Sequence, residues 1–135
     1  MNNKGFTLIE LLTVIAIIAI LSAITLVTFP MAQDRAADAR TINAMQQLRT
    51  AAEASYGAYG SYAQVMDGGD ATVDTLIDEI VANATSYTLF RDADNGGYCA
   101  EAVLKAGGRR WCIDSDMYSD YVTGAQCAAA GDRCE

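Results

Sequence analysis

The stretch that decides the fold is Gly5-Phe6-Thr7-Leu8-Ile9-Glu10, followed by a run without charged residues from Leu11 to Phe29. As a helix that rises about 1.5 Å per residue, residues 6–29 are long enough to cross a hydrocarbon core of roughly 30 Å. Lys4 precedes this apolar segment. Because basic residues favour the cytoplasmic side of a transmembrane helix, we expect this end to stay cytoplasmic and the remainder to be translocated.

Glu10 is the one acid in this segment. A cleaved secretory signal needs small residues three and one positions before its cut, and the residues from Leu21 onward offer no good site of this kind. An ordinary membrane anchor explains the length of the segment but not the acid. A carboxylate deep in the bilayer costs about 2–3 kcal/mol and usually marks a functional site. Glu10 is therefore a candidate functional residue that needs a partner.

Residues 5–10 and the long apolar helix after them resemble the processing and assembly signature of type IV pilins, in the type IVa style, and of the related pseudopilins. The resemblance implies that a prepilin peptidase cuts after Gly5 and methylates the new N-terminus on Phe6. It also implies that Glu10 pairs with the N-terminal amine of a neighbouring subunit. Cleavage would leave that amine in apolar surroundings, where an ammonium and a carboxylate compensate each other and fix the axial register of the subunits.

An α+β fold with four parts follows from this resemblance and from the pattern of the chain. Residues 1–5 are the cleaved leader, 6–29 the membrane and filament-core helix, 30–60 its amphipathic upper half, and 61–135 a globular head. The upper half should pack on a small antiparallel β-sheet with a disulfide-closed C-terminal region. Many pilins have a helix-breaking residue inside the apolar segment, whereas here Pro30 stands at its end. Proline removes a backbone donor, so we expect a kink or local melting at Pro30.

The upper half of the helix shows one apolar stripe. Residues at intervals of three or four predict its buried face: Ile42, Met45, Leu48 or Arg49, Ala52, Tyr56 and Tyr59. The mixed-charge segment 34–40 is expected to be solvated. Tyr56, Tyr59 and Tyr62 follow one another at intervals of three, and we interpret them as helix–sheet packing rather than as a stripe that stacks ligands or conducts electrons.

The head contains a second helix and several strands. Apolar residues between Thr72 and Ala84 predict a short helix with Thr72 as its N-cap. Residues 86–90, 98–104 and 109–114 predict strands, the last two as a hairpin around residues 105–108.

The turn of this hairpin can be placed in two ways. If Cys99 faces Cys112 directly, the turn centres on Lys105-Ala106, whereas Gly107 and Gly108 favour a turn one residue later. A β-bulge near the glycines would reconcile the two placements, with Trp111 on the face opposite Cys112.

Four cysteines lie in the head: Cys99, Cys112, Cys127 and Cys134. A small head buries little surface, and an even number of cysteines after a membrane-directing segment predicts disulfides formed outside the cytoplasm. The simplest connectivity is Cys99–Cys112 and Cys127–Cys134, although four cysteines allow three pairings. Each such loop would contribute about 2.5–3 kcal/mol by restricting the unfolded chain. The loop between Cys127 and Cys134 also resembles the disulfide-closed C-terminal loop of type IV pilins.

The net charge is −8, the pI is near 4.3, and histidine is absent. An acidic surface repels phosphate, so specific nucleic-acid binding is not expected, and we interpret Arg109-Arg110-Trp111 as one face of a solvated strand. The lack of histidine excludes His-dependent catalytic pairs and His-ligated metals. Residues 91–97 lack two ligands of the calcium-loop pattern and, like residues 114–116, are interpreted as a polar turn. We predict no catalytic residue, no metal and no cofactor.

The leading prediction is a non-enzymatic structural subunit of a type IV pilus. It would be a precursor in the bacterial inner membrane and then part of an extracellular filament. The expected partners are other copies of the chain in a helical homopolymer, the prepilin peptidase, the pilus assembly machinery and, before assembly, the membrane. Small residues would let the filament-core helices approach closely: Ala16, Ala19, Ser22 and Ala23. The alternatives are a type II secretion pseudopilin, or a minor or tip pilin that binds a surface in adhesion or DNA in uptake.

Overall fold

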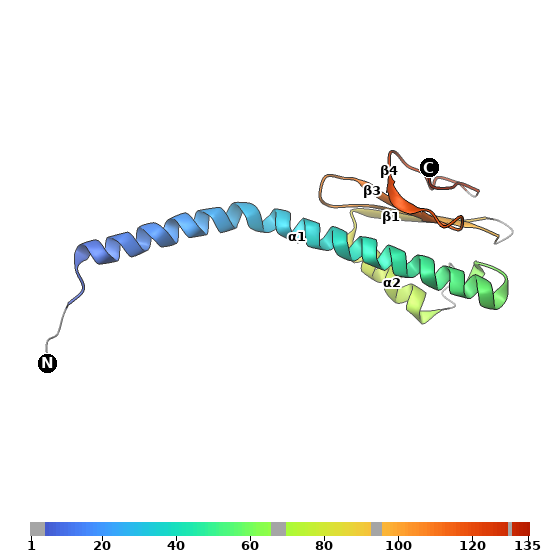
Figure 1. The fold of residues 1–135 in the computed structure, drawn as a ribbon, viewed down its shortest axis with the longest axis horizontal. Coiled ribbons are helices and arrows are strands. Elements are labelled where there is room, and N and C mark those ends of the chain that lie inside the picture. The colour runs from blue at the N-terminus through green and yellow to red at the C-terminus, as the bar shows by residue number, and fades with distance from the viewer. Residues whose placement is uncertain (1–4, 66–69, 93–95, 130) are drawn as a thin grey trace. The chain divides into compact units, whose positions relative to one another are not determined.

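The computed structural model describes residues 5–65, 70–92, 96–129 and 131–135. Its elements are drawn in Figure 1: α1 (Leu8–Tyr59), a short 3₁₀ helix η1 (Ala63–Val65), α2 (Ala71–Asn83), β1 (Ser86–Arg91), β2 (Tyr98–Val103), β3 (Arg110–Asp114) and β4 (Ser119–Val122). The predicted α+β fold is confirmed, with a long N-terminal helix, a small antiparallel sheet and two disulfides in the C-terminal region. The chain forms two compact units, Met1–Gln33 and Asp34–Glu135. The predicted division at residues 5, 29 and 60 remains a prediction.

The first unit contains the N-terminal part of α1, and every residue from Gly5 to Gln33 is exposed. Pro30 lies inside the helix, and the residues on both sides of it are helical. Proline removes the hydrogen bond to one carbonyl, that of Leu26, while the neighbouring turns keep theirs. Local melting at Pro30 is therefore not found in this structure, and the kink remains a prediction.

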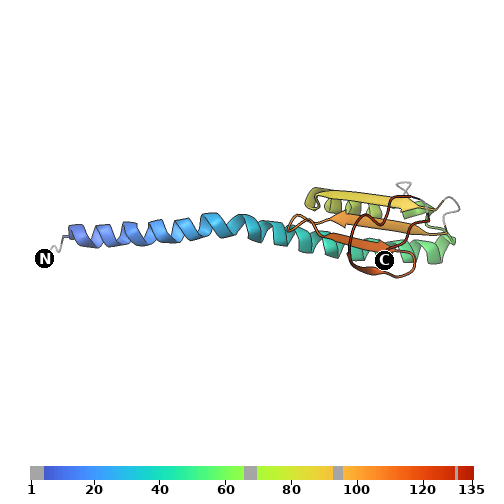
Figure 2. The same ribbon diagram turned by 90° about the horizontal axis from the view of Figure 1, so that it is seen from above.

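The second unit is built on a four-stranded antiparallel sheet with the order β1-β2-β3-β4. Each strand pairs with the next one along the chain, so the sheet is a simple meander. Figures 1 and 2 show the helices of this unit on one face of the sheet and the C-terminal segment across the other. β4 was not predicted, because its sequence Ser-Asp-Tyr-Val is short and mostly polar.

The β2–β3 hairpin has the later of the two turn placements considered from the sequence, the one that Gly107 and Gly108 favour. Cys99 pairs with Asp114, and Cys112 pairs with Glu101, so the two cysteines are not opposite each other. Pairing is continuous from Val103–Arg110 to Cys99–Asp114, and the predicted direct pairing and β-bulge are both wrong. The physical reason is a four-residue turn, 105–108, in which both glycines have positive φ, 83° and 64°. This turn shifts β3 by two residues relative to β2.

The main core fills the space between the helices and one face of the sheet. Met45 and Leu48 on α1 have no exposed surface, and Trp111 packs in the same cluster, on the face opposite Cys112 as predicted. The predicted stripe is correct as far as Ala52 and wrong beyond it, because Tyr59 is 71% exposed. Small or polar residues instead extend the buried face: Thr41, Ala44 and Ser55. A search for large apolar residues overlooks these short side chains.

Tyr62 brings the predicted tyrosine series into the core. Its ring stacks on Tyr56 with the centroids 4.6 Å apart and meets the ring of Tyr98 edge-on at 4.9 Å. Burial and the hydrogen bond that its hydroxyl donates to Glu53 raise the pKa of Tyr62 to about 12. The packing interpretation therefore holds for Tyr56 and Tyr62, whereas Tyr59 projects into solvent.

Asp38 corrects the prediction that residues 34–40 are solvated. Its side chain is only 7% exposed. Oδ1 accepts the backbone N–H of Lys105 at 2.7 Å, and Oδ2 accepts that of Ala106 at 3.1 Å. A carboxylate on α1 thus satisfies the first two donors of the β2–β3 turn. The charged neighbours Asp34 and Arg40 are exposed, as predicted.

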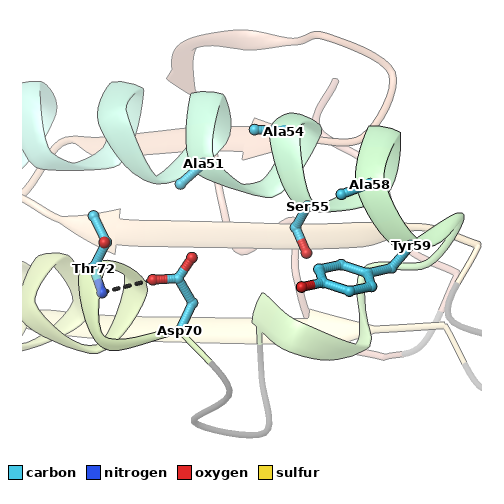
Figure 3. A pocket seen from close by; sticks show the side chains of 7 residues that line it. All are labelled: Ala51, Ala54, Ser55, Ala58, Tyr59, Asp70 and Thr72. Carbon is cyan, nitrogen blue, oxygen red and sulfur yellow. Dashed lines mark hydrogen bonds between the residues drawn. The ribbon is translucent and has the colours of Figure 1, made fainter.

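The second helix begins at Ala71, and its N-cap is Asp70, two residues before the predicted cap Thr72. Oδ1 of Asp70 accepts the N–H of Thr72 at 2.8 Å (Figure 3). Hydrogen bonds from the backbone and side chain of Thr72 hold the pKa of Asp70 below its usual value. A cavity of about 340 Å³ lies beside this cap and is lined partly by Ser55, whose buried hydroxyl has no hydrogen-bond partner in the described residues. Residues 66–69 lie outside the described part of the chain.

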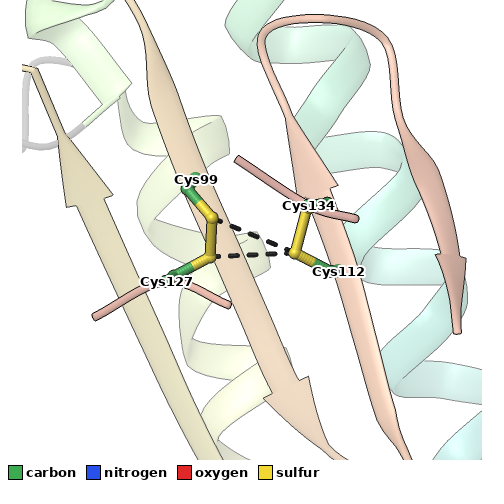
Figure 4. Close-up of side chains that lie close together, drawn as sticks. All are labelled: Cys99, Cys112, Cys127 and Cys134. Atoms are coloured by element: carbon green, nitrogen blue, oxygen red, sulfur yellow. Dashed lines mark hydrogen bonds between the residues drawn. A yellow bond between two sulfur atoms is a disulfide. The ribbon is translucent and has the colours of Figure 1, made fainter. Parts of the chain in front are cut away.

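The disulfides are Cys99–Cys127 and Cys112–Cys134, with Cα–Cα distances of 5.5 and 5.9 Å (Figure 4). The predicted pairing is therefore wrong. Cys99 and Cys112 are diagonal neighbours that both point away from the helices, so each bonds to the C-terminal segment that crosses this face. The bridges span sequence separations of 28 and 22 residues and interleave along the chain. In a chain-entropy estimate each contributes about 3.5 kcal/mol, more than the shorter loops expected from the sequence.

Candidate processing and assembly site

Thr7 and Glu10 form a capping box at the start of α1. The backbone N–H of Glu10 donates to Oγ1 of Thr7 at 3.3 Å. In return, Oε2 of Glu10 accepts the backbone N–H of Thr7 at 2.8 Å and its hydroxyl at 2.7 Å. This reciprocal arrangement is the one expected for a Thr-x-x-Glu sequence at a helix N-terminus. The sequence interpretation missed it, although Thr7-Leu8-Ile9-Glu10 shows the pattern.

The capping box gives the acid a local reason to be in an apolar segment. The first N–H groups of a helix have no partner within the helix, and leaving them unpaired is costly where water is scarce. The box satisfies two such donors, and a carboxylate in the first turn interacts favourably with the helix dipole. Glu10 therefore has a partner within its own chain before any second subunit is considered.

One oxygen of Glu10 remains available. Within the part of the chain that the structure describes, both bonds to the carboxylate use Oε2 and none reaches Oε1. An ionised carboxylate accepts about four hydrogen bonds, so the box leaves room for a further donor. Phe6, the residue before the N-cap, lies outside the helix and is 87% exposed. The first residue of the predicted mature chain and one oxygen of Glu10 are thus both accessible.

Gly5 is not required by the fold. Among the described residues, a Cβ placed on it would meet nothing within 4 Å, and its φ is not in the positive range that favours glycine. Gly107 and Gly108, by contrast, have positive φ at the hairpin turn. Because the structure itself accommodates a side chain at residue 5, any need for glycine there comes from something other than folding.

The segment after the capping box exposes apolar side chains on all sides. In the described residues, α1 is the one helix long and apolar enough to cross a membrane, and none of its most apolar stretch is buried. Its threonine hydroxyls are satisfied internally, because they donate to backbone carbonyls three or four residues earlier: Thr13, Thr25 and Thr28. These polar groups therefore do not require water.

The basic stretch Arg109-Arg110-Trp111 is engaged in contacts within the head, so its interpretation as one face of a solvated strand is wrong for the buried Trp111. Arg110 forms an ion pair with Glu101. The guanidinium of Arg109 lies over the ring of Tyr121, 4.3 Å from its centroid. Trp111 is buried in the core and meets the same ring edge-on. These residues stabilise the sheet.

The two acidic segments also have structural roles in the part that is described. Asp92 accepts a hydrogen bond from Arg133 at 3.0 Å, which holds the pKa of Asp92 below its usual value; residues 93–95 of that segment lie outside the described residues. Asp114 is buried and accepts the N–H groups of Asp116 and Tyr118, so it forms a polar turn as predicted. Its second oxygen accepts the N–H of Cys134.

Comparison with protein-family models matches residues 1–26 to the prokaryotic N-terminal methylation motif. The matched residues include Gly5, Phe6 and the Thr7–Glu10 box. Comparisons with curated proteins and with solved structures find no match. The apolar helix that follows the box fits a membrane-anchored precursor. Residues 1–26 thus carry the type IV pilin signature, which supports a pilin-like or pseudopilin precursor.

Proposed function

We propose that this chain is the structural subunit of a type IV pilus filament. The observation that carries the proposal is the fully exposed apolar segment of α1, which begins at the capped Glu10. An apolar surface of this length is stable in lipid or against other apolar helices, and not in water. The methylation motif over the same residues implies filament assembly and processing by a prepilin peptidase in general.

The proposed sequence of events begins in the inner membrane. The apolar segment spans the bilayer, with Lys4 on the cytoplasmic side. The peptidase cuts after Gly5 and methylates the new amine on Phe6. Cleavage removes Lys4 and leaves an ammonium group directly before Thr7, in apolar surroundings.

The ammonium on Phe6 then pairs with Glu10 of the neighbouring subunit. Because the capping box uses Oε2, Oε1 can accept this donor while the bonds to Thr7 persist. The new bond is charge-assisted and therefore stronger than a bond between neutral groups. An isolated buried charge costs several kcal/mol, so a subunit added in the wrong register is disfavoured. The pair acts chiefly on register and contributes little net stability.

Filament growth replaces lipid contacts of the apolar segment with contacts between helices. Close approach of the helices needs small side chains on the exposed surface of α1, and the segment has four of them: Ala16, Ala19, Ser22 and Ala23. The motors that drive growth belong to the assembly machinery.

Two substitutions of Glu10 test the pairing. Glu10→Leu removes both the cap and the charge, whereas Glu10→Gln keeps the capping pattern and removes only the charge. We expect both variants to insert in the membrane as wild type does, and both to be largely excluded from filaments when expressed together with wild-type subunits. Normal incorporation of Glu10→Gln would mean that the acid acts only as a cap, and would overturn the pairing.

A further inference from the structure

The four cysteine sulfurs form a single buried cluster on the outer face of the sheet. All four Sγ atoms lie within 4.8 Å of one another, although they belong to two separate disulfides. Sγ of Cys112 lies 3.9 Å from Sγ of Cys99 and 3.8 Å from Sγ of Cys127 (Figure 4). Disulfide sulfurs carry no hydrogen, so these are van der Waals contacts. None of the four residues is more than 7% exposed.

We propose that, when both disulfides are reduced, the four cysteine thiolates bind one Zn²⁺ in a tetrahedral site. Zinc–sulfur bonds of about 2.3 Å at tetrahedral angles place the ligand sulfurs about 3.8 Å apart. The two contacts between the disulfides already have this length. The other two distances between the disulfides, from Sγ of Cys134 to Sγ of Cys99 and of Cys127, are within 4.8 Å. These distances and the two bonded pairs have to adjust, by rotation of the side chains. Four thiolates around one Zn²⁺ are a common structural zinc site.

The positions of the ligands do not depend on the disulfides alone. Cys99 and Cys112 are fixed by the continuous pairing of β2 with β3. Two buried carboxylates on these strands hold the C-terminal segment against them. Oε2 of Glu101 accepts the N–H of Gln126 at 2.8 Å, next to Cys127, and Oδ2 of Asp114 accepts the N–H of Cys134 at 2.9 Å. These bonds keep all four cysteines on one face when the disulfides are open.

A phosphine can serve as the reductant that opens the two disulfides before the metal binds. Each disulfide takes up two electrons and two protons and becomes two thiols, while one phosphine and one water become a phosphine oxide. Zn²⁺ then displaces four protons and leaves a complex with two negative charges. Apolar neighbours surround the sulfurs and limit the access of water: Phe90, Tyr118 and Val122.

The test is an anaerobic Co²⁺ titration of the full chain in detergent micelles, after reduction and removal of the phosphine. We expect the absorption of tetrahedral Co²⁺ bound by thiolates, saturating at one Co²⁺ per chain and bleached by one equivalent of Zn²⁺. The unreduced chain, whose thiols are all in disulfides, serves as the matched control and should give no such absorption. Absence of the tetrahedral signal in the reduced chain would overturn the proposal, as would an equal signal in the unreduced chain.

Two further measurements distinguish a metal site formed by the folded head from loose Co²⁺ binding by the cysteines of an unfolded chain. Asp114→Ala removes the acceptor that holds Cys134 and should weaken Co²⁺ binding about tenfold or more, as loss of a supporting residue does at other metal sites. Denaturant should weaken binding by the reduced wild-type chain. Unchanged affinity in both measurements, or saturation at one Co²⁺ per two chains, would contradict a preformed site.

Discussion

Oε2 of Glu10 lies 2.8 Å from the backbone nitrogen of Thr7, so the acid of the apolar segment is already bonded within its own helix. The proposed pairing with the amine of another subunit would add to this bond and not replace it, because both bonds to Thr7 use Oε2 and none uses Oε1. The cap and the proposed register contact can therefore be separated by substitution.

Thr7→Val removes the hydroxyl and keeps the shape of the side chain. Loss of an N-cap hydroxyl costs about 1 kcal/mol, which corresponds to roughly fivefold faster opening of the first helical turn. We expect this increase in amide hydrogen exchange at residues 8–11 of the chain in micelles, with no change beyond residue 35. Unchanged exchange at residues 8–11 would show that the box contributes nothing to the helix start.

Gly5→Val should leave the fold and membrane insertion unchanged, because a Cβ at this position meets no atom within 4 Å. If the peptidase needs glycine before its cut, the same variant should accumulate as the uncleaved precursor. The measurement is the mass of the chain purified from membranes, alongside its circular dichroism. Normal cleavage of Gly5→Val would show that processing does not require glycine at this position.

Asp38→Ala should destabilise the head by about 2 kcal/mol, because it leaves two backbone donors of the β2–β3 turn without their acceptor. Asp34→Ala, at an exposed position one turn earlier on the same helix, is the matched control and should change stability by less than about 0.5 kcal/mol. Thermal unfolding followed by near-ultraviolet circular dichroism reports both. Equal stability of the two variants would contradict the anchoring role of Asp38.

Tyr62 should make the head sensitive to alkali. Its pKa is raised to about 12 in the folded chain, against about 10 when unfolded, so its contribution to stability is complete below about pH 10 and is lost as the pH rises towards 12. Tyr62→Phe should therefore lose less stability than wild type over this range. An identical pH dependence of the unfolding midpoint in the two proteins would count against a buried, protonated Tyr62.

The disulfide pairing is directly measurable by peptide mapping without reduction. Trypsin together with a protease that cuts before aspartate separates Cys112, in fragment 111–113, from Cys127, in fragment 120–131. We expect fragment 120–131 joined to the peptide that contains Cys99, and fragment 111–113 joined to residues 134–135. A link between the peptides of Cys99 and Cys112 would contradict the pairing in the structure and support the one expected from the sequence.

Short sequence patterns predicted the positions of helices and strands, because these depend mainly on residues close together in the chain. The uncharged run from Leu11 to Phe29 predicted the long helix, and two strand segments around the glycine-containing turn 105–108 predicted the hairpin. Contacts between distant residues could not be predicted in this way. Asp38 accepts hydrogen bonds from Lys105 and Ala106, which follow it by 67 and 68 positions in the chain. The hairpin register depends on the positive φ of two glycines, and that register decides which cysteines meet. The Thr7–Glu10 box, in contrast, is a local pattern that could have been recognised.

We propose that this chain is cleaved after Gly5 and polymerises through its apolar helix. The intact mass of the main component of filaments sheared from the cell surface tests both steps. We expect this chain, beginning at Phe6 and carrying one N-terminal methyl group. Filaments that contain the chain with Met1 still present would contradict the processing claim. Filaments in which this chain is absent or only a trace component would contradict its role as the principal subunit and favour a pseudopilin or a minor pilin.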